Sequence, residues 1–409
     1  MRPKKIFFLI NSLDTGGSER VLSQVARDFS EKKGVEVKVF TIIDVNRIDP
    51  GLKYTPLVRE KTISYTEWLF SSIDMFGAFS SYASKFRKIV EREKPDMIIS
   101  FLELSNFINI RVSSSVARKP KCVISVRSNL SLVYDGFGNM LVREKIKSLY
   151  PQADMIIANS SFSAGDLVKN FGCGPGKVRV VHNPVDLERI ERLAKGKLPA
   201  KYSGFFGPGV KAIISVGRLN HFKGQKYLLE AFANVRKKIA SGRLVIVGDG
   251  ELREKLKGQA RDLGIESDVL FAGDQQNPYN FISKADVFAF TSVQEGFPNA
   301  MLEALACGTP VVSTDCIAGP AEILSPGSRA GKLKAAREAR FGVLVPSFSE
   351  SDSGSEKERK LRILESTIIK VLNSPSVRKK YRKAGPSRAG DFDRKKVSEG
   401  FFRTINSIL

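Results

Sequence analysis

The sequence predicts an α/β protein made of two doubly wound parallel sheets, each in a domain of its own. The chain has 409 residues, too many for one small core, and 42% of them are hydrophobic, enough to fill two cores of ordinary size. Short apolar runs, typical of strands buried on both faces, recur along the chain with amphipathic stretches between them. A stretch rich in glycine, proline and charge divides these runs into two sets.

The first domain is expected over residues 1–190. Its strands are predicted at residues 6–10, 35–42, 97–101, 122–126, 155–158 and 178–182. The second domain is expected over residues 191–385. Its strands are predicted at residues 212–217, 244–248, 269–272, 287–291, 310–313 and 342–346. Residues 386–409 are expected to form a C-terminal helix that returns to the first domain.

Three stretches lack this strand and helix pattern. Residues 183–209 are rich in glycine, proline and charge, and we interpret them as the interdomain linker. Residues 325–340 and 347–360 are polar and poor in apolar side chains, so we expect mobile loops on either side of the last strand. We assign no chemistry to these two loops.

The chain is strongly basic, with 66 Lys and Arg against 43 Asp and Glu and a formal net charge of +23. Such an excess indicates a polyanionic partner such as nucleic acid, anionic lipid or nucleotide phosphate. The residues at 64–94 join an aromatic stretch that contains the only tryptophan, Trp68, to a basic helix. They indicate peripheral attachment to an anionic membrane surface, and the alternative is that Trp68, Phe70 and Phe76 pack in the core.

The four cysteines form no C-x-x-C pair, so neither a zinc site nor a disulfide framework is indicated. Reduced thiols in the cytoplasm are the simpler interpretation. The first apolar run stops at Asn11, too early for a signal peptide, and no run reaches the length of a membrane span. We therefore expect a cytoplasmic protein, with attachment to the inner face of the cytoplasmic membrane left open.

Two glutamates stand in the stretch FTSVQEGFPNAMLEALACGTPVVSTD, residues 290–315. Glu295 follows a predicted strand, and Glu303 lies eight residues on, in a helix that Pro298 is suited to begin. At about 100° per residue, eight helical steps return to within about 80° of the start, so Glu303 can face the same cleft. Paired carboxylates of this kind accept hydrogen bonds from vicinal hydroxyls. The alternative is a turn residue and a solvated helix residue.

Two bases follow another predicted strand in AIISVGRLNHFKGQ, residues 212–225. Arg218 can form paired hydrogen bonds with phosphate oxygens, and Lys223 can supply a compact charge. Together they suit a diphosphate whose charge must be neutralised as it leaves. The alternative is a pair of solvated loop charges.

Weaker signals lie in other turns after strands. Gly16 and Gly17 would let backbone N–H groups approach an anion at the start of the next helix, although a tight turn explains them equally well. VGDGEL, residues 247–252, is interpreted as a turn with Asp249 or Gly250 near the helix N-cap. The two histidines have no Ser and Asp partners that would indicate a hydrolase triad. We expect an internal hydrogen bond for His182 and support of the Arg218 to Lys223 loop for His221.

These residues together resemble the GT-B glycosyltransferases of family four, which retain the anomeric configuration and use nucleotide sugars. The resemblance lies in EGFPNAMLEALACGTPVV with its E-x7-E spacing, VGRL, HFKGQ, GDGEL and GGSER, and it covers nearly the whole chain. Bacterial enzymes that add hexose or N-acetylhexosamine units to polyprenyl-diphosphate-linked glycans are especially similar. The resemblance implies two Rossmann-like domains with a cleft between them.

The resemblance also implies roles for individual residues. Glu295 would hold hydroxyls of the donor sugar, and Glu303 would bind the nucleotide ribose. Arg218 and Lys223 would neutralise the diphosphate. The loop Gly296, Phe297, Pro298 and Asn299 would pack on sugar and phosphate. No cofactor and no metal are expected, because Arg and Lys stabilise the leaving group and no Asp-x-Asp motif is placed to hold a cation.

Gly16 and Gly17 are expected among the substrate-binding residues. On the acceptor side the resemblance points to Ser18 and to Arg127, which stands where many relatives have a histidine. A guanidinium can orient an acceptor phosphate but is a poor proton acceptor, so we assign Arg127 no base role. The attack would then be assisted by the leaving diphosphate itself. The expected function is transfer of a hexose or N-acetylhexosamine, with a UDP-sugar favoured, to a glycan or lipid-linked acceptor in cell-envelope synthesis.

Two other functions remain open. A GT-B sugar-nucleotide epimerase would need an acid and base pair in the cleft, which the sequence does not reveal. A basic nucleic-acid-binding protein would account for the net charge, but the chain has neither an RRM-like aromatic signature nor a helix-turn-helix pattern. We therefore expect no nucleic-acid partner.

Overall fold

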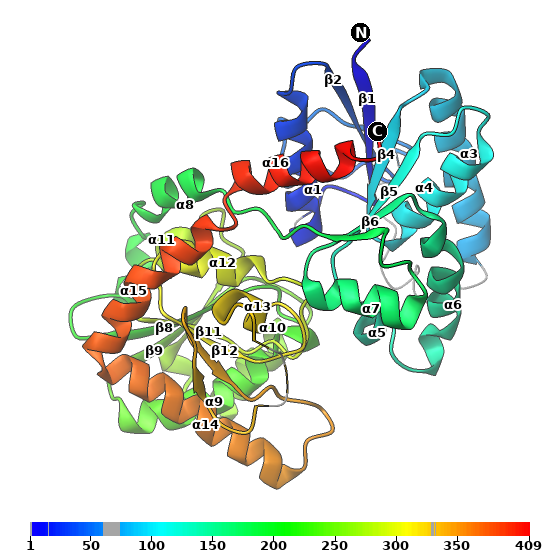
Figure 1. Ribbon diagram of the computed structural model, residues 1–409. Coiled ribbons are helices and arrows are strands. Elements are labelled where there is room, and N and C mark those ends of the chain that lie inside the picture. Colours follow the sequence, from blue (N-terminus) through cyan, green and yellow to red (C-terminus); the bar gives the residue numbers. More distant parts are fainter. Residues whose placement is uncertain (1, 15, 60–73, 329–330, 332) are drawn as a thin grey trace. The chain divides into compact units, whose positions relative to one another are not determined.

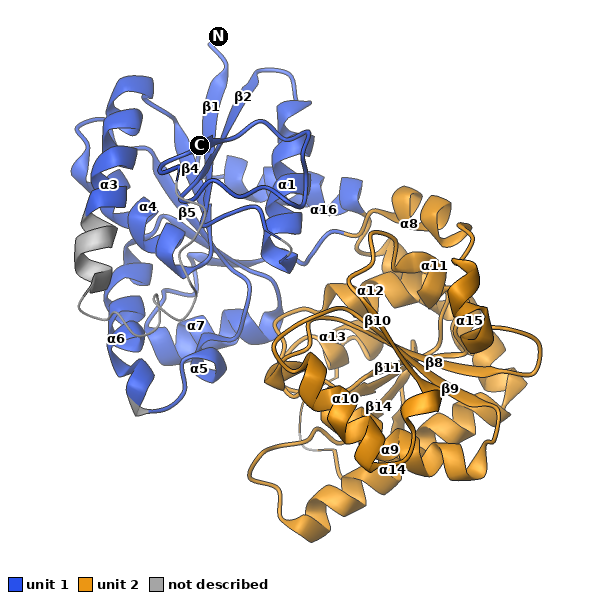
Figure 2. Cartoon of the chain, turned by 180° about the vertical axis from the view of Figure 1, so that it is seen from behind, with its two compact units in different colours: residues 1–184, 394–409 blue, residues 185–393 orange. Residues whose placement is uncertain are grey.

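The computed structural model describes residues 2–14, 16–59, 74–328, 331 and 333–409. The chain divides into two compact units, coloured separately in Figure 2. The first unit comprises residues 1–184 and 394–409, and the second comprises residues 185–393. The unit boundaries differ by several residues from the expected 190 and 385.

The first unit is built on a parallel sheet with the order β3-β2-β1-β4-β5-β6-β7 over its described residues. Its strands are β1 (Lys4–Ile10), β2 (Val35–Thr41), β3 (Thr55–Pro56), β4 (Met97–Phe101), β5 (Lys121–Val126), β6 (Met155–Ala158) and β7 (Val178–Val180). Every strand expected for this domain is confirmed. The sequence did not predict β3, an edge strand too short to form a hydrophobic pattern.

Helices cover both faces of this sheet (Figure 1). They are α1 (Gly17–Ser30), α3 (Asp74–Glu93), α4 (Glu103–Ser115), α5 (Leu130–Val133), α6 (Met140–Leu149), α7 (Ser161–Phe171) and α16 (Arg394–Asn406). Alternate residues of β1 face the two layers. Phe8 packs in a cluster with Phe29 of α1 and Phe401 of α16, whereas Phe7 packs with Phe86 of α3. This alternation is the buried-on-both-faces pattern from which the strand was predicted.

The last helix, α16, belongs to the first unit. The ring of Phe29 meets the rings of Phe401 and Phe402 edge-on, with centroid distances of 5.8 and 5.1 Å. Asp28 of α1 accepts a hydrogen bond from the Ser398 hydroxyl and forms an ion pair with Arg394 at 3.4 Å. Apolar packing and the contacts of Asp28 therefore fix α16 to α1.

The second unit is built on a sheet with the order β10-β9-β8-β11-β12-β14-β13 over its described residues. Its strands are β8 (Lys211–Val216), β9 (Gly242–Val247), β10 (Val269–Gly273), β11 (Val287–Phe290), β12 (Val311–Thr314), β13 (Arg337–Glu338) and β14 (Val343–Val345). Only β13 runs antiparallel, and it was not predicted. All the strands that the sequence predicted are confirmed.

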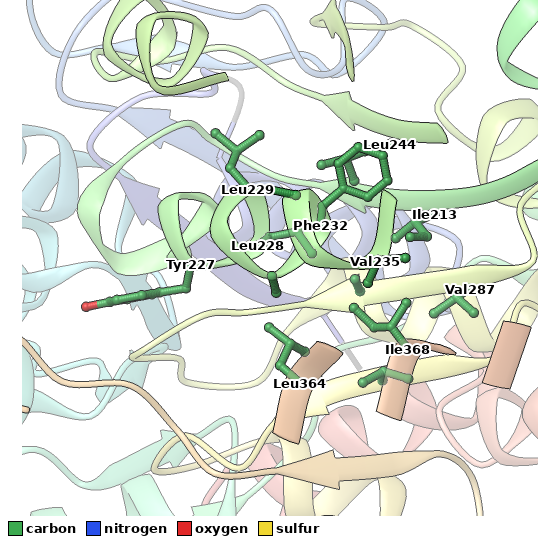
Figure 3. Packing of buried hydrophobic residues seen from close by; sticks show 14 of the residues in the cluster. Ile213, Tyr227, Leu228, Leu229, Phe232, Val235, Leu244, Val287, Leu364 and Ile368 are labelled. Atoms are coloured by element: carbon green, nitrogen blue, oxygen red, sulfur yellow. The ribbon is translucent and has the colours of Figure 1, made fainter. Parts of the chain in front are cut away.

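The helices of the second unit are α8 (Leu187–Ala194), α9 (Gln225–Lys238), α10 (Arg253–Asp262), α11 (Tyr279–Ile282), α12 (Asn299–Ala306), α13 (Pro320–Leu324), α14 (Gly354–Asn373) and α15 (Pro375–Gly390). Figure 3 shows part of the core between α9, α14 and the strands. Phe232 of α9 and Ile368 of α14 are fully buried there with Ile213 of β8 and Val287 of β11. The second sheet is thereby held as a rigid base for the loops at its ends.

Three expectations about irregular segments are wrong in part. Most of 183–209 is not a linker, because residues from 185 on belong to the second unit and include α8, which the Asp186 side chain caps by accepting from Arg189 N–H at 3.0 Å. The loop expected at 347–360 ends early, because Ser353 caps α14. The segment 325–340 contains the edge strand β13.

The second unit continues past the expected boundary at residue 385 because α15 packs closely on α12. A Cβ at Gly385 would lie 2.9 Å from the Leu305 carbonyl oxygen, so only glycine permits this approach. Across the part of the chain that the structure describes, no helix combines the length and the apolar character needed to cross a membrane.

Candidate functional site

The strand order of the second sheet predicts where its ligand binds. Strands β9 and β10 lie on one side of β8, whereas β11, β12 and β14 lie on the other. In open α/β sheets, ligands bind beyond the carboxyl ends of the strands where the order reverses. The loops that follow β8 and β11 are therefore expected to form the site, and these loops carry Lys223 and Glu295.

Lys223 and Glu295 meet at this edge of the sheet. The Lys223 Nζ lies 2.6 Å from the Glu295 Oε1, and the Ser292 hydroxyl donates to the same oxygen at 2.8 Å. The Glu295 side chain is 10% exposed and the Lys223 side chain 27%. The sequence predicted both residues for the site but not their direct contact. The pair joins the two loops, and part of each side chain remains exposed.

The turn that carries Lys223 is locked onto the loop after β11. The Lys223 backbone N–H donates to the Asn220 side chain at 3.2 Å, and the Lys223 carbonyl accepts from the Thr291 hydroxyl at 3.3 Å. Gly224 has a φ of +62°, and a Cβ there would lie 2.2 Å from the Thr291 carbonyl oxygen. Glycine at 224 is therefore required for Lys223 to reach Glu295.

The GDGEL turn after β9 supports the same loop from the other side. A Cβ at Gly248 would lie 2.1 Å from the Gly217 carbonyl oxygen. The interpretation of this stretch as turn chemistry near a helix start is confirmed, although no described side chain caps the helix. Helix α10 begins at Arg253 after Leu252, and Asp249 instead forms an ion pair with Arg253 at 2.9 Å. Close backbone packing therefore accounts for the glycine at 248.

Arg218 lies at the rim of this site. Its side chain is 74% exposed, and its Nε lies 3.9 Å from the Glu251 Oε2. Among the contacts of the described residues, the Arg218 side chain reaches neither Lys223 nor Glu295. A long, exposed side chain at this position can turn toward a bound diphosphate without breaking a buried contact.

Glu303 lies in the first turns of α12 and is buried, with 8% of the residue exposed. Its Oε1 accepts a hydrogen bond from the hydroxyl of Tyr279, in α11, at 3.3 Å. The alternative that Glu303 is a solvated surface residue is therefore wrong. Burial and the neighbouring Glu303 charge raise the pKa of the Cys307 thiol to about 12. The sequence did not indicate Tyr279, because an aromatic residue in the turn after β10 does not by itself predict a binding site.

The loop from Gly296 to Asn299 contributes backbone to the site. The Phe297 side chain is buried against Phe392, with ring centroids 5.3 Å apart, so it serves the core of the second unit. A Cβ at Gly319 would lie 2.5 Å from the Pro298 Cδ and 3.1 Å from the Gly296 carbonyl oxygen. The loop after β12 thus packs tightly behind this turn and fixes its shape.

Gly16, Gly17 and the residues expected on the acceptor side all lie in the first unit. Gly16 is the N-cap of α1, and Gly17 and Ser18 form its first turn. A Cβ at Gly16 would lie 2.1 Å from the Glu19 Oε2, because the Glu19 carboxylate folds back over this glycine. In this structure an acid of the chain itself therefore stands at the turn where an anion was expected.

Arg127 follows β5 directly and lies over the ring of Phe101 at the end of β4, 5.6 Å from its centroid. Its guanidinium donates to the Ser125 hydroxyl at 3.3 Å and to the Asn183 side-chain oxygen. Burial lowers the pKa of Arg127 to about 9, which is far enough above neutrality to keep it charged. Phe101, Ser125 and Asn183, which contact this cation, are neutral, so it can accept an anionic ligand group.

The described residues include no cluster of three or more His, Cys, Asp or Glu side chains arranged to hold a metal ion. His221 is exposed in a short 3-10 turn (His221–Lys223), where its backbone helps to form the loop that carries Lys223.

Two family models match the chain, one in each unit. Residues 15–189 match Glycosyltransferase Family 4, and residues 204–340 match Glycosyl transferases group 1. A relative from Campylobacter jejuni is 30% identical over 97% of both chains and is named N-acetylgalactosamine-N,N'-diacetylbacillosaminyl-diphospho-undecaprenol 4-alpha-N-acetylgalactosaminyltransferase. An uncharacterized glycosyltransferase of Methanocaldococcus jannaschii is 30% identical over 76% of this chain and 80% of its own length.

Solved structures show the same fold. Anabaena HepE, crystallised with UDP and glucose, matches 99% of this chain and 100% of its own with a TM-score of 0.74 at 18% identity. The predicted fold, two parallel-sheet domains of the GT-B type, is thereby confirmed. Because a full-length relative reaches 30% identity, the chain belongs to the family 4 glycosyltransferases with the GT-B fold.

Proposed function

We propose that this glycosyltransferase moves a hexose or N-acetylhexosamine from a UDP-sugar, with retention, to a glycan or polyprenyl-diphosphate-linked acceptor of the cell envelope. The observation that carries the proposal is the contact between Lys223 and Glu295 at the strand-order reversal of the second sheet. The name of the Campylobacter relative supports a lipid-diphosphate acceptor, and the UDP in the HepE structure supports the nucleotide.

The charges at this edge suit a nucleotide sugar. Lys223 and the exposed Arg218 would neutralise the diphosphate, whereas Glu295 would accept hydrogen bonds from hydroxyls of the transferred sugar. Because Lys223 already contacts Glu295, one bound donor can engage both residues, with its phosphate on the base and its sugar on the acid. Glu303, held by Tyr279, would accept from the ribose hydroxyls. Gly296, Pro298 and Asn299 would offer backbone groups to sugar and phosphate.

The acceptor would bind to the first unit. Arg127 would hold an anionic group of the acceptor, and the α1 start at Gly16, Gly17 and Ser18 would contact its polar groups once Glu19 turns away. In the transfer step, the acceptor oxygen bonds to the anomeric carbon while the bond from that carbon to the diphosphate oxygen breaks. The acceptor proton passes to the departing diphosphate oxygen, so the chain need not supply a base.

A donor screen tests the proposed function. Purified protein is incubated with each UDP- and GDP-sugar, with and without a membrane extract, and nucleotide release is measured together with the sugar incorporated into lipid. We expect release that depends on the extract, is strongest with a UDP-sugar and is matched by labelled lipid. Conversion of the donor to its epimer without an acceptor would instead favour the epimerase alternative, and no release with any donor would refute the proposal.

Transfer is expected to continue in excess EDTA, because Lys223 and Arg218 supply the charge that a cation would otherwise provide. The rate should remain within about twofold of the untreated rate. The measurement compares initial rates in EDTA with rates after Mg²⁺ or Mn²⁺ is restored. Loss of activity on chelation, reversed by either cation, would show that these side chains do not suffice.

Membrane attachment is a further part of the proposal, and it would place the enzyme in the cytoplasm at the inner face of the membrane. The segment that carries Trp68 and Phe70 lies outside the described residues, and the structure resumes with α3 at Asp74. We expect the protein to sediment with anionic liposomes at low salt and to be released at high salt.

Two variants sharpen this membrane test. Trp68→Glu should weaken sedimentation, because it removes the aromatic group expected at the interface. Leu263→Glu, at an exposed apolar position of the second unit, is the matched control and should sediment as the wild type does. If the wild-type protein stays in the supernatant with liposomes as it does without them, attachment through this segment is refuted.

A further inference from the structure

The residue that links β4 to α4 has a strained backbone. Leu102 has a φ of 72° and a ψ of 154°, a region that is otherwise almost restricted to glycine. Its side chain packs against the apolar cluster formed by β1, α1 and α16, which holds the residue in place. Strain of this kind persists where the surrounding structure enforces it, and it is frequent at ligand sites. Its effect here is to start α4 immediately at Glu103.

Glu103 is an acid without a described cationic partner. It is partly exposed, and no Lys or Arg among the described residues forms an ion pair with it. Burial raises the pKa of Glu103, while its own backbone N–H and the Tyr134 hydroxyl stabilise the charged form. The negative charge is also felt by Tyr150, whose pKa is raised by burial and by Glu103. An acid in such surroundings is usually matched by a cation or retained for a ligand.

Glu103 lies where the first sheet should bind its ligand. The strand order reverses between β1 and β4, and Glu103 follows the carboxyl end of β4. Asn11, just after β1, is tied to the same helix by a hydrogen bond from the Ser105 hydroxyl at 2.8 Å. Arg127 lies at the end of the neighbouring β5. Its described side-chain hydrogen bonds go to Ser125 and Asn183, and none of them goes to Glu103. An acid and a base thus stand at adjacent strand ends without pairing.

We propose that Glu103 binds the acceptor, accepting a hydrogen bond from a hydroxyl of the acceptor sugar and orienting it for attack. The proposal rests on the proposed function and adds a specific acceptor contact in the first unit. A carboxylate can only accept hydrogen bonds, so its ligand must be a donor, and a sugar hydroxyl is the donor that the reaction supplies. The proton of the attacking hydroxyl still passes to the leaving diphosphate, so Glu103 orients the nucleophile and does not act as its base.

The competing explanation is structural, because an acid in the first turn of a helix stabilises that helix and can accept from Tyr134. The two explanations differ in what a substitution changes. A structural acid would affect folding, nucleotide binding and transfer together. An acceptor contact would affect only the reaction with the acceptor.

The test uses the full chain with Glu103→Gln, which keeps the shape and the hydrogen bond from Tyr134 but removes the charge. We expect transfer from the UDP-sugar to lipids of a membrane extract to fall about 10- to 100-fold, as for loss of a charged hydrogen bond. Calorimetric affinity for free UDP, slow hydrolysis of the donor by water and the melting temperature should stay close to wild type, because none of them involves the acceptor.

The matched control is Asp166→Asn. Asp166 is an acid of the first unit that, like Glu103, accepts from a hydroxyl, that of Ser131, but it lies in the middle of α7 and not in the first turn of a helix. Its transfer rate should remain within about threefold of wild type. Glu103→Gln with unimpaired transfer, or with UDP binding and donor hydrolysis lost in parallel, would overturn the acceptor assignment. A wild-type protein that releases no nucleotide from any donor would instead refute the proposed function itself.

Discussion

Replacing Lys223 with alanine is expected to lower kcat/KM for sugar transfer by roughly 30- to 1,000-fold, or about 2–4 kcal/mol of transition-state stabilisation. The ammonium would stabilise negative charge that develops on the diphosphate as the bond to the sugar breaks. The variant also removes the cation that lies 2.6 Å from the Glu295 carboxylate. The Glu295 side chain, which is only 10% exposed, then keeps the hydrogen bond from the Ser292 hydroxyl. Arg218→Ala should lower the rate for the same electrostatic reason, with the fold and the Lys223 contact intact.

The matched control for this substitution is Lys226→Ala. Lys226 lies three residues further on and forms an ion pair with Glu350 at 2.5 Å, away from Glu295. Initial rates at varied donor concentration should separate the two variants, with Lys226→Ala near the wild-type rate. If Lys223→Ala transfers sugar at a wild-type rate while it remains folded, Lys223 does not act on the leaving group.

Replacing Glu303 with alanine is expected to weaken binding of both donor and free nucleotide by about 1–3 kcal/mol, as for loss of charged hydrogen bonds to two hydroxyls. Glu303 lies in the first turns of a rigid helix and is held by Tyr279, so its carboxylate is already oriented in the free protein. Because the ribose contact is the same in the ground state and the transition state, the rate at saturating donor should change less than the affinity does.

Tyr279→Phe is the companion variant for Glu303. It removes the hydroxyl that lies 3.3 Å from the Glu303 Oε1 but leaves the carboxylate in place. We expect a smaller loss of nucleotide affinity than in Glu303→Ala, since orientation is lost but the hydrogen-bond acceptor is not. A Tyr279→Phe effect that equals the Glu303→Ala effect would assign the nucleotide contact to the tyrosine instead.

The fold could be predicted because strands of a parallel sheet are buried on both faces and therefore appear as short, almost wholly apolar runs. The edge strands β3 and β13 have two residues each, which is too short for any pattern. Helix α8 was not predicted, although Leu187, Ile190 and Leu193 have helical spacing after the Asp186 cap, because the glycine, proline and charge around it indicated a linker. The start of α14 could have been found, since Ser353 and Glu356 have the spacing of a capping box.

The sequence predicted residues of the site but not which of them contact one another. Lys223 and Glu295 were expected to serve phosphate and sugar separately, whereas the structure brings their charged atoms within 2.6 Å. Residues distant in sequence meet only through the sheet order, which apolar runs do not specify. Tyr279 and Glu103 were not predicted for the same reason. The role of each depends on a hydrogen bond with a residue outside its own helix.

The central claim is that the second unit binds a nucleotide sugar with Glu295 on the sugar and Glu303 on the nucleotide. Calorimetric titration of free UDP into Glu295→Ala and Glu303→Ala tests it most directly, because free UDP carries no sugar. The account predicts wild-type UDP affinity for Glu295→Ala, whose defect should lie in kcat, and weakened affinity for Glu303→Ala. Loss of UDP binding in Glu295→Ala with unchanged binding in Glu303→Ala would contradict it.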